Sequence, residues 1–224
     1  MESAQIIKTI NDIYRRFKVP RNLQEHMRRT AAVGDLICDK WKGPGLHNDD
    51  IIATLLLHDL GNIIKMDLES EKGLRLLGAD RRRTQEIKEI QDQMIEKYGK
   101  DDHAATYAIA KEIGASEHVL ELLDSKVFTK IDQIVTGKDI ELKICAYADL
   151  RVGPLGILML KERFGELRHR VSNETLAERY PNFEELAVAA QQIEAQIFEH
   201  LQIAPEEIND FTIELYLEKR LMGF

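Results

Sequence analysis

Two histidines and two aspartates of this chain are residue types that bind divalent metal ions, and two of them occur where polar residues are unusual. His58 and Asp59 come directly after the most hydrophobic segment of the sequence, residues 51–57. Burying a carboxylate without a partner costs several kcal/mol. A metal ion or a basic side chain is therefore expected beside this pair.

His26 and Asp149 point toward the predicted core from two other segments. Residues 30, 33, 34 and 37 follow His26 at helical spacing, and Asp149 shares a helix face with Leu142, Cys145 and Val152. Taken singly, each residue is also typical of a hydrogen-bonded core side chain. Together, two imidazoles and two carboxylates form a ligand set suited to Mn, Fe, Co, Ni, Zn or, less well, Mg.

The segments that must position these residues have a helical pattern. Apolar residues recur at intervals of three and four, and residues 132–136 are the only strand candidate. Capping residues such as Asp80, Asp101 and Ser116 mark several helix starts, and Ser3 stands where the first cap belongs. We expect helices over about 3–17, 20–41, 48–58, 70–77, 81–98, 102–114, 116–127, 139–152, 154–170, 174–201 and 205–221.

The composition favours one all-α domain over residues 1–224. The 224 residues are 44% hydrophobic, enough for a sizeable core, and only 6% aromatic with 5 prolines, which disfavours a β-sandwich or barrel. Cys38 and Cys145 cannot form a disulfide framework or a four-sulfur zinc site, and they suit a reducing compartment. No repeat or linker divides the sequence.

Charge and hydropathy exclude several partners. Lys and Arg number 31 against 39 Asp and Glu, a net charge of −8, so binding to a nucleic-acid polymer is not expected. No run of about 18 apolar residues is present, so we expect no membrane span. The first residues show no secretory signal, and the expected location is the cytoplasm.

The segment from about residue 174 onward reads as two amphipathic helices. The first has an apolar stripe at positions 186, 190, 193, 197 and 201, and a second stripe begins with Phe211, Leu215 and Leu217. Packing of these stripes on the bundle is the expected arrangement, and a homodimer interface is the alternative.

The order of the four metal-binding residues resembles the H…HD…D signature of the HD-domain superfamily of metal-dependent phosphohydrolases. His26 is followed by His58-Asp59 after 32 residues and by Asp149 after another 90. The contexts LLLHDLG at 55–61 and CAYADLR at 145–151 are similar to that family's helix ending in HD and to its last ligand-bearing helix. The resemblance covers about residues 20–155, and residues 156–224 form a C-terminal helical extension.

The resemblance implies an all-α bundle that holds one divalent metal ion (Mn, Co, Ni, Fe, Zn or Mg) through His26, His58, Asp59 and Asp149. In such proteins the metal polarises a phosphoryl oxygen and lowers the pKa of a bound water molecule. It also implies a small phosphorylated substrate, commonly a nucleotide. The alternative function is a non-catalytic regulatory protein that senses a metal or a nucleotide.

Two departures from the family pattern narrow the activity. Asn62-Ile63 stand where relatives that hydrolyse (p)ppGpp have an acidic pair, so that activity loses support. Relatives that bind two metal ions have two further histidines. His103 resembles the first of them, and no histidine matches the second. We therefore predict one metal ion, and we do not expect the oxidation that some relatives carry out with two iron ions. His103 itself lines the pocket, binds a weak second metal, or faces water at a helix start.

Other charged residues are candidates for catalysis and substrate binding. Besides Asp59 and His103, Asp67 resembles a position used as a general base, and it is equally suited to cap the following helix. Lys65, Arg151 and Arg29 lie close in sequence to the metal-binding residues and are candidates to bind phosphate, with solvated salt bridges as the alternative. We interpret residues 81–83 as an exposed ion-pair face, and the remaining histidines as surface or structural: His47, His118, His169 and His200.

Overall fold

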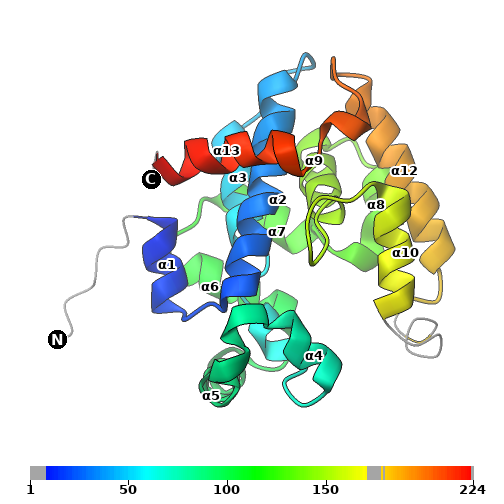
Figure 1. Cartoon of the computed structure of the whole chain (residues 1–224). Helices are drawn as coiled ribbons and strands as arrows, with labels where there is room; N and C mark the ends of the chain where they lie inside the picture. The colour runs from blue at the N-terminus through cyan, green and yellow to red at the C-terminus, as the bar shows by residue number, and fades with distance from the viewer. Residues whose placement is uncertain (1–8, 171–177, 179, 223–224) are drawn as a thin grey trace.

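A computed structural model of the chain describes residues 9–170, 178 and 180–222. Within those ranges every element is a helix, and extended pairing is limited to two isolated bridges, Trp41 with Leu201 and Val152 with Ile157. The prediction of an all-α fold is confirmed (Figure 1). None of the described helices is both long and apolar enough to cross a membrane.

The first half of the described chain supplies the helices that surround the predicted metal site. They are α1 Ile10–Arg16, α2 Arg21–Lys40, α3 Asn48–Leu57, η1 Asn62–Lys65, α4 Glu71–Leu76, η2 Gly78–Arg83, α5 Thr84–Tyr98, α6 Asp102–Glu112 and α7 Glu117–Ser125. The second half contains η3 Phe128–Lys130, α8 Ile131–Thr136, α9 Ile140–Leu150, α10 Leu160–Arg170, α12 Phe183–Phe198, η4 Pro205–Glu207 and α13 Asp210–Met222. The η elements are short 3-10 helices.

Side-chain caps fix several helix starts where the sequence predicts them. The Asp101 carboxylate accepts a hydrogen bond from the Ala104 N–H, and the Ser116 hydroxyl accepts one from the Val119 N–H. The prediction for Asp80 is wrong, because it lies inside η2 and its carboxylate accepts hydrogen bonds from the Arg21 N–H and the Arg83 guanidinium. The predicted cap Ser3 falls outside the described residues.

Two other predictions of secondary structure are corrected. Residues 132–136 belong to α8, because Ile131, Ile134 and Val135 bury one helical face in the core, and this packing overrides their β propensity. The helix predicted over 154–170 begins only at Leu160: Pro154 lacks an N–H, and the Gly153 N–H closes a turn on the Gly156 carbonyl at 2.8 Å.

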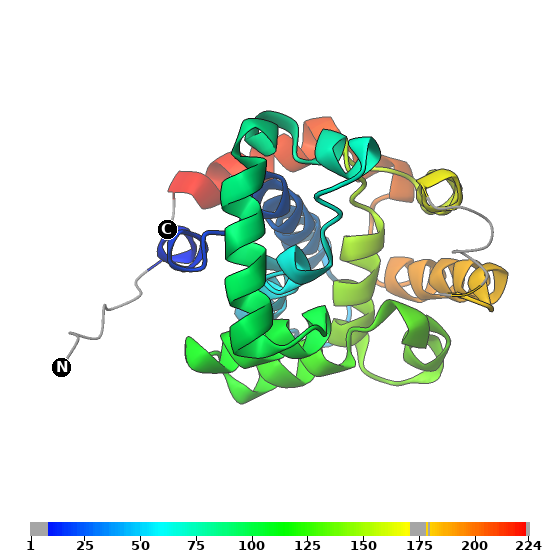
Figure 2. The same cartoon turned by 90° about the horizontal axis from the view of Figure 1, so that it is seen from below.

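The interior contains two hydrophobic clusters, and α2 and α3 contribute to both. One cluster joins the later parts of α2 with α8, α9, α10, α12 and α13, while the other joins the start of α2 with α1 and η1 to α7. α7 also contributes to both, through Leu122 and Leu123, but α2 and α3 are the two that lie at the centre of the bundle in both views (Figure 1 and Figure 2). They pack closely because Gly34 has no side chain; a Cβ there would lie 2.4 Å from Leu55 Cδ1.

The C-terminal helices pack on the bundle. The stripe of α12 is buried at Leu186, Ala190, Ile193 and Ile197, which belong to the same cluster as α9. In α13, Ile213 is buried but Phe211 and Leu215 are 83% and 59% exposed. Packing is therefore confirmed for α12, and the homodimer interface stays a prediction.

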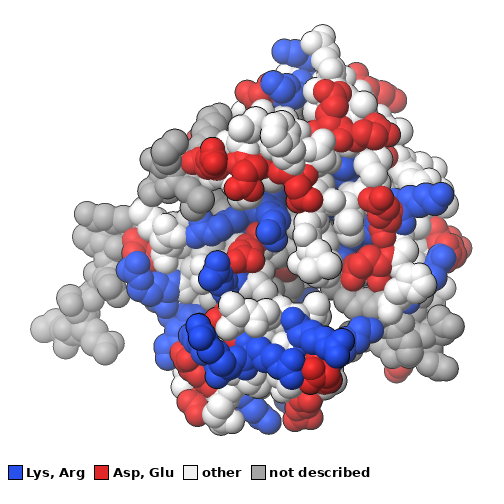
Figure 3. All heavy atoms as spheres, viewed as in Figure 1, with Lys and Arg blue, Asp and Glu red and all other residues white. Residues whose placement is uncertain are grey.

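Arg81 and Arg83 form the ion pairs of the exposed face that we predicted for residues 81–83. Lys and Arg side chains gather over α4 and α5 with acidic side chains among them (Figure 3). Arg81 lies 2.7 Å from Glu71, and Arg83 lies 2.9 Å from Glu86. Exposed pairs of this kind contribute little to stability.

Arg151 is part of the core, and the prediction that it binds substrate is wrong. The residue is 1% exposed. Its guanidinium donates hydrogen bonds to the carbonyl oxygens of Leu158, Pro205 and Ile208 and to the Tyr147 hydroxyl, at 2.5 to 3.1 Å. With its donors bonded in this way, Arg151 ties α9 to the segment that leads into α13.

Replacing Arg151 by methionine removes these hydrogen bonds and leaves three carbonyl groups without this donor, of which that of Ile208 is in a buried residue. We expect Arg151→Met to lower the free energy of unfolding by about 3 kcal/mol. Urea denaturation followed by circular dichroism measures the change. Arg15, whose side chain is 79% exposed, is the matched control, and equal losses in Arg151→Met and Arg15→Met would contradict the buried role.

Candidate metal centre

The four predicted metal ligands come from three helices and meet where the two hydrophobic clusters adjoin. His26 lies in the second turn of α2, His58 and Asp59 follow the last residue of α3, and Asp149 is in the last turn of α9. His58 is buried, while the other three are partly buried. The structure therefore brings together the residues that the sequence predicts to meet.

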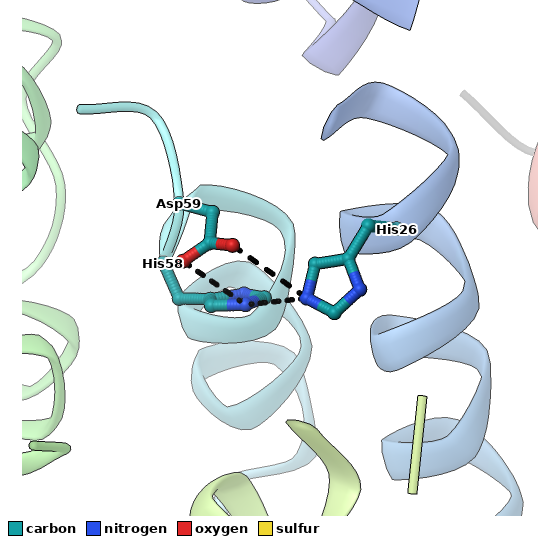
Figure 4. A group of neighbouring side chains, drawn as sticks. All are labelled: His26, His58 and Asp59. Atoms are coloured by element: carbon teal, nitrogen blue, oxygen red, sulfur yellow. Dashed lines mark hydrogen bonds and ion pairs between the residues drawn. The ribbon is translucent and has the colours of Figure 1, made fainter. Parts of the chain in front are cut away.

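The ring nitrogens and carboxylate oxygens lie within a few ångströms of one another. His26 Nε2 is 3.3 Å from His58 Nε2, 3.6 Å from Asp59 Oδ2 and 3.1 Å from Asp149 Oδ1. His58 Nε2 is 3.5 Å from Asp59 Oδ1 and 3.3 Å from Asp149 Oδ1. Figure 4 shows the His26 ring pointing from α2 toward His58 and Asp59 at the end of α3.

A backbone carbonyl fixes the orientation of the His58 ring. His58 Nδ1 lies 2.7 Å from the Leu55 carbonyl oxygen, which can only accept, so the proton of a neutral ring is on Nδ1. Nε2 then presents its lone pair to His26, Asp59 and Asp149. Metal-binding histidines are commonly oriented by such a bond from the other ring nitrogen.

The arrangement concentrates electron lone pairs that repel one another unless a positive charge lies among them. Lys126 supplies one cation: its Nζ is 2.6 Å from Asp149 Oδ2, and its side chain is 10% exposed. The two oxygens of Asp149 thus have different partners, with Oδ1 facing the histidines and Oδ2 bound to the lysine. The donor set on the other side of Asp149 fits a divalent metal ion.

Both carboxyl groups are held in the ionised state. Burial alone raises the pKa of Asp149, but the Lys126 ammonium and, when they are protonated on both nitrogens, the His58 and His26 rings hold it well below its usual range. Burial likewise opposes ionisation of Asp59, and the same two rings in their protonated form lower the pKa of that carboxyl below its usual value. Carboxylates rather than carboxylic acids are the ligands that a divalent cation requires.

Lys126 is the residue of this site that the sequence analysis did not identify. It follows the last residue of α7 and stands 23 residues before Asp149, so helical spacing does not link the two. The available signal is a lysine in the last turn of the helix expected over 116–127. Such a residue is common on protein surfaces, and only the tertiary contact distinguishes it.

Two further predicted substrate-binding residues lie near the metal ligands. Lys65 pairs with Asp102 at 2.6 Å; desolvation lowers its pKa, but the charge of Asp59 and the bond to Asp102 raise it above the usual value. Arg29 is half-buried one turn after His26, and it forms no hydrogen bond or ion pair with another described residue. Arg29 therefore remains available to a phosphate. So does Lys65, because its side chain is 56% exposed although it pairs with Asp102.

Asp67 and His103, predicted to be catalytic, are not part of the cluster. Asp67 is exposed and accepts hydrogen bonds from the N–H groups of Glu69 and Ser70 and from the Ser70 hydroxyl, which lower its pKa. It orders the turn before α4, whose cap is the Ser70 hydroxyl bonded to the Gly73 N–H, so the structure supports neither the assignment of Asp67 as a general base nor its capping of this helix. His103 Nε2 lies 3.1 Å from the Asp124 carbonyl oxygen and links α6 to α7.

Gly61 follows His58-Asp59-Leu60 at a position where no side chain fits. The Gly61 N–H donates to the Thr106 hydroxyl at 2.9 Å, and a Cβ at Gly61 would lie 2.2 Å from the Asp102 carbonyl oxygen. The backbone of α6 therefore lies directly against the turn that holds the two ligands. Any side chain at this position would push that turn and α6 apart.

Chemically, the cluster offers two imidazoles and two carboxylates to one cation, next to lysine and arginine side chains that can bind an anion. Comparison with models of known protein families, with curated proteins and with solved structures finds no match for this chain. The geometry of the cluster and its neighbouring cations is therefore the basis for the functional proposal below.

Replacing Lys126 by methionine tests its electrostatic role at Asp149. A carboxyl group whose pKa is lowered on folding adds stability above its unfolded pKa, and this contribution disappears as the pH falls through the folded pKa. Without Lys126 the folded pKa of Asp149 rises. We therefore expect metal-free Lys126→Met to be less stable than wild type by about 1–3 kcal/mol near pH 7.

The difference between the two proteins should shrink as the pH falls through the folded pKa of Asp149 in Lys126→Met, and it should vanish below the lower folded pKa of wild type, because the unfolded chain titrates alike in both. Urea unfolding in the presence of a chelator, at several pH values, measures it. A difference that stays constant from neutral to acidic pH would show that Lys126 acts through packing alone.

Proposed function

We propose that this chain is a metal-dependent phosphohydrolase that cleaves a phosphate ester or anhydride bond in a small molecule. One observation supports it most. The ring nitrogens of two histidines lie within 3.6 Å of carboxylate oxygens of two aspartates, beside the Lys126 ammonium, although the four residues come from three separate segments: His26, His58, Asp59 and Asp149. The nucleotide as substrate class rests on the resemblance to HD-domain phosphohydrolases.

The four ligands have distinct tasks in this proposal. His58, oriented by the Leu55 carbonyl, and His26 present their Nε2 atoms, while Asp59 and Asp149 supply negative charge. A divalent metal ion held by these four residues would polarise a phosphoryl oxygen and lower the pKa of a bound water molecule, so that a nucleophile would be available near neutral pH. The carboxylates stay ionised throughout because their pKa values are low.

Positively charged side chains around the cluster bind the phosphate. Lys126 is fixed by Asp149 and Lys65 by Asp102, so both ammonium groups are positioned before the substrate arrives. Arg29, on the same helix as His26, can donate two parallel hydrogen bonds to phosphate oxygens. These groups neutralise charge on the substrate and orient its phosphorus atom toward the metal ligands.

The decisive experiment measures phosphate release from a panel of nucleotides with Mn²⁺, Co²⁺, Ni²⁺ and Mg²⁺ supplied separately. We expect turnover with at least one metal, and we expect Asp59→Asn to lower kcat about 1000-fold, the equivalent of roughly 4 kcal/mol of transition-state stabilisation. Asp67→Asn is the matched control, because Asp67 only orders a turn, and it should retain wild-type turnover.

Unchanged turnover in Asp59→Asn would refute the proposed site. If no metal supports turnover but the chain binds a metal and a nucleotide, the regulatory alternative replaces the enzyme. Equilibrium dialysis with each metal and nucleotide separates these two outcomes.

The two peripheral cations should affect substrate binding more than the chemical step. We expect Arg29→Met and Lys65→Met each to raise KM about tenfold, since each removes a charge-assisted hydrogen bond to phosphate. Lys88→Met removes an exposed lysine paired with Glu69, 3.6 Å away, and should leave KM unchanged. Steady-state kinetics on the best nucleotide checks this, and an effect on kcat alone would contradict a role in binding.

A further inference from the structure

A second group of side chains that could bind a metal ion lies at the opposite ends of α3 and α9, the helices that position His58, Asp59 and Asp149. His47 directly precedes α3, Glu141 is in the first turn of α9, and His118 is in the first turn of α7. One ligand atom from each lies within 4.8 Å of the others. The sequence analysis assigned both histidines to surface or structural roles and did not consider Glu141.

The His118 ring is oriented for binding by an aspartate. His118 Nδ1 lies 3.0 Å from Asp50 Oδ2, so this nitrogen donates to the carboxylate, and Asp50 also accepts a hydrogen bond from the Ser116 hydroxyl at 3.1 Å. In the neutral ring Nε2 then has a lone pair, and it faces Glu141 Oε2 at 3.3 Å. These two acceptor atoms repel each other unless a cation lies between them.

Glu141 supplies an independent indication of a ligand. Its side chain is only 9% exposed. Oε1 accepts the His47 backbone N–H at 2.7 Å and lies 3.1 Å from His47 Nδ1, but the buried Oε2 has no hydrogen-bond partner among the described residues. A buried carboxylate oxygen without a hydrogen bond is costly, and a metal ion bound to it removes that cost.

We infer that His47, His118 and Glu141 form a second site, which binds a divalent transition-metal ion of the zinc class. Two imidazoles and one carboxylate are a known ligand set for zinc. Asp50 is a positioning residue, because it holds the His118 ring through the nitrogen that does not bind the metal. The His47 side chain is 74% exposed, so the ion can reach the site from solvent.

This site is separate from the cluster at His58. The 10 residues of α3 lie between His47 and His58, and ten residues of α-helix span about 15 Å. A metal ion there joins the starts of α3, α7 and α9, whose other ends adjoin the first cluster. We assign it a structural role: it stabilises the packing of these three helices, and the inference does not depend on the proposed hydrolase activity.

The test compares zinc binding and thermal unfolding of the full chain after removal of metal by a chelator. We expect His47→Gln/His118→Gln to lose one equivalent of Zn²⁺ relative to wild type, and His58→Gln/Asp59→Asn to keep the equivalent that the first variant loses. Zn²⁺ should raise the Tm of His58→Gln/Asp59→Asn, in which only the second site is intact, and the rise in His47→Gln/His118→Gln should be smaller than the rise in wild type. His169→Gln, a change at an exposed histidine of α10, should behave as wild type in both assays.

Asp50→Asn should weaken zinc binding about tenfold at this site without abolishing it. His47→Gln alone, at an exposed side chain, guards against misfolding of the double variant, and it should also lose the equivalent while its metal-free circular dichroism spectrum stays unchanged. Retention of the full zinc stoichiometry by His47→Gln and by the double variant would overturn the inference. A failure of the first site to bind metal would leave the comparison intact, because wild type would then bind one ion and His47→Gln none.

Discussion

The centre of this protein depends on one constraint: nitrogen and oxygen atoms that carry lone pairs are held close together. The Nε2 atoms of His26 and His58 and the carboxylate oxygens of Asp59 and Asp149 approach to between 3.1 and 3.6 Å. Lone pairs at that separation repel, so rigid helices must hold them and a positive charge must balance them. The close packing of α2 on α3 provides the rigidity, and the Lys126 ammonium provides part of the charge.

Sequence periodicity was sufficient to predict that these four residues point inward, because a buried polar residue must share a helix face with apolar ones. His26 and Asp149 satisfied that rule on their own helices, and His58-Asp59 followed the most apolar segment of the chain. The same rule predicted most helices, since their faces repeat at the helical period. It predicted which polar residues meet but neither the distances between them nor the rotation of the histidine rings.

The features that the sequence did not predict are those decided by contacts between distant segments. Lys126 and Arg151 are both basic residues, and the sequence does not distinguish their roles. Lys126 binds Asp149, whereas Arg151 is buried in the core and donates hydrogen bonds to backbone carbonyl oxygens. Residues 132–136 have β-branched side chains typical of a strand, and packing makes them a helix. His47 and His118 are assembled only when α3, α7 and α9 align. Local pattern contains none of this information.

The bonds of Arg151 also constrain the order of events during synthesis. Its guanidinium is satisfied partly by the carbonyl oxygens of Pro205 and Ile208, more than 50 residues downstream, and it lies two residues after Asp149 on the same segment. A nascent chain that has not yet released residue 208 from the ribosome would have to bury a charged group without these acceptors. We therefore expect the last turn of α9 to reach its final position only after residues 205–208 are available to it, although α2 and α3 emerge from the ribosome much earlier.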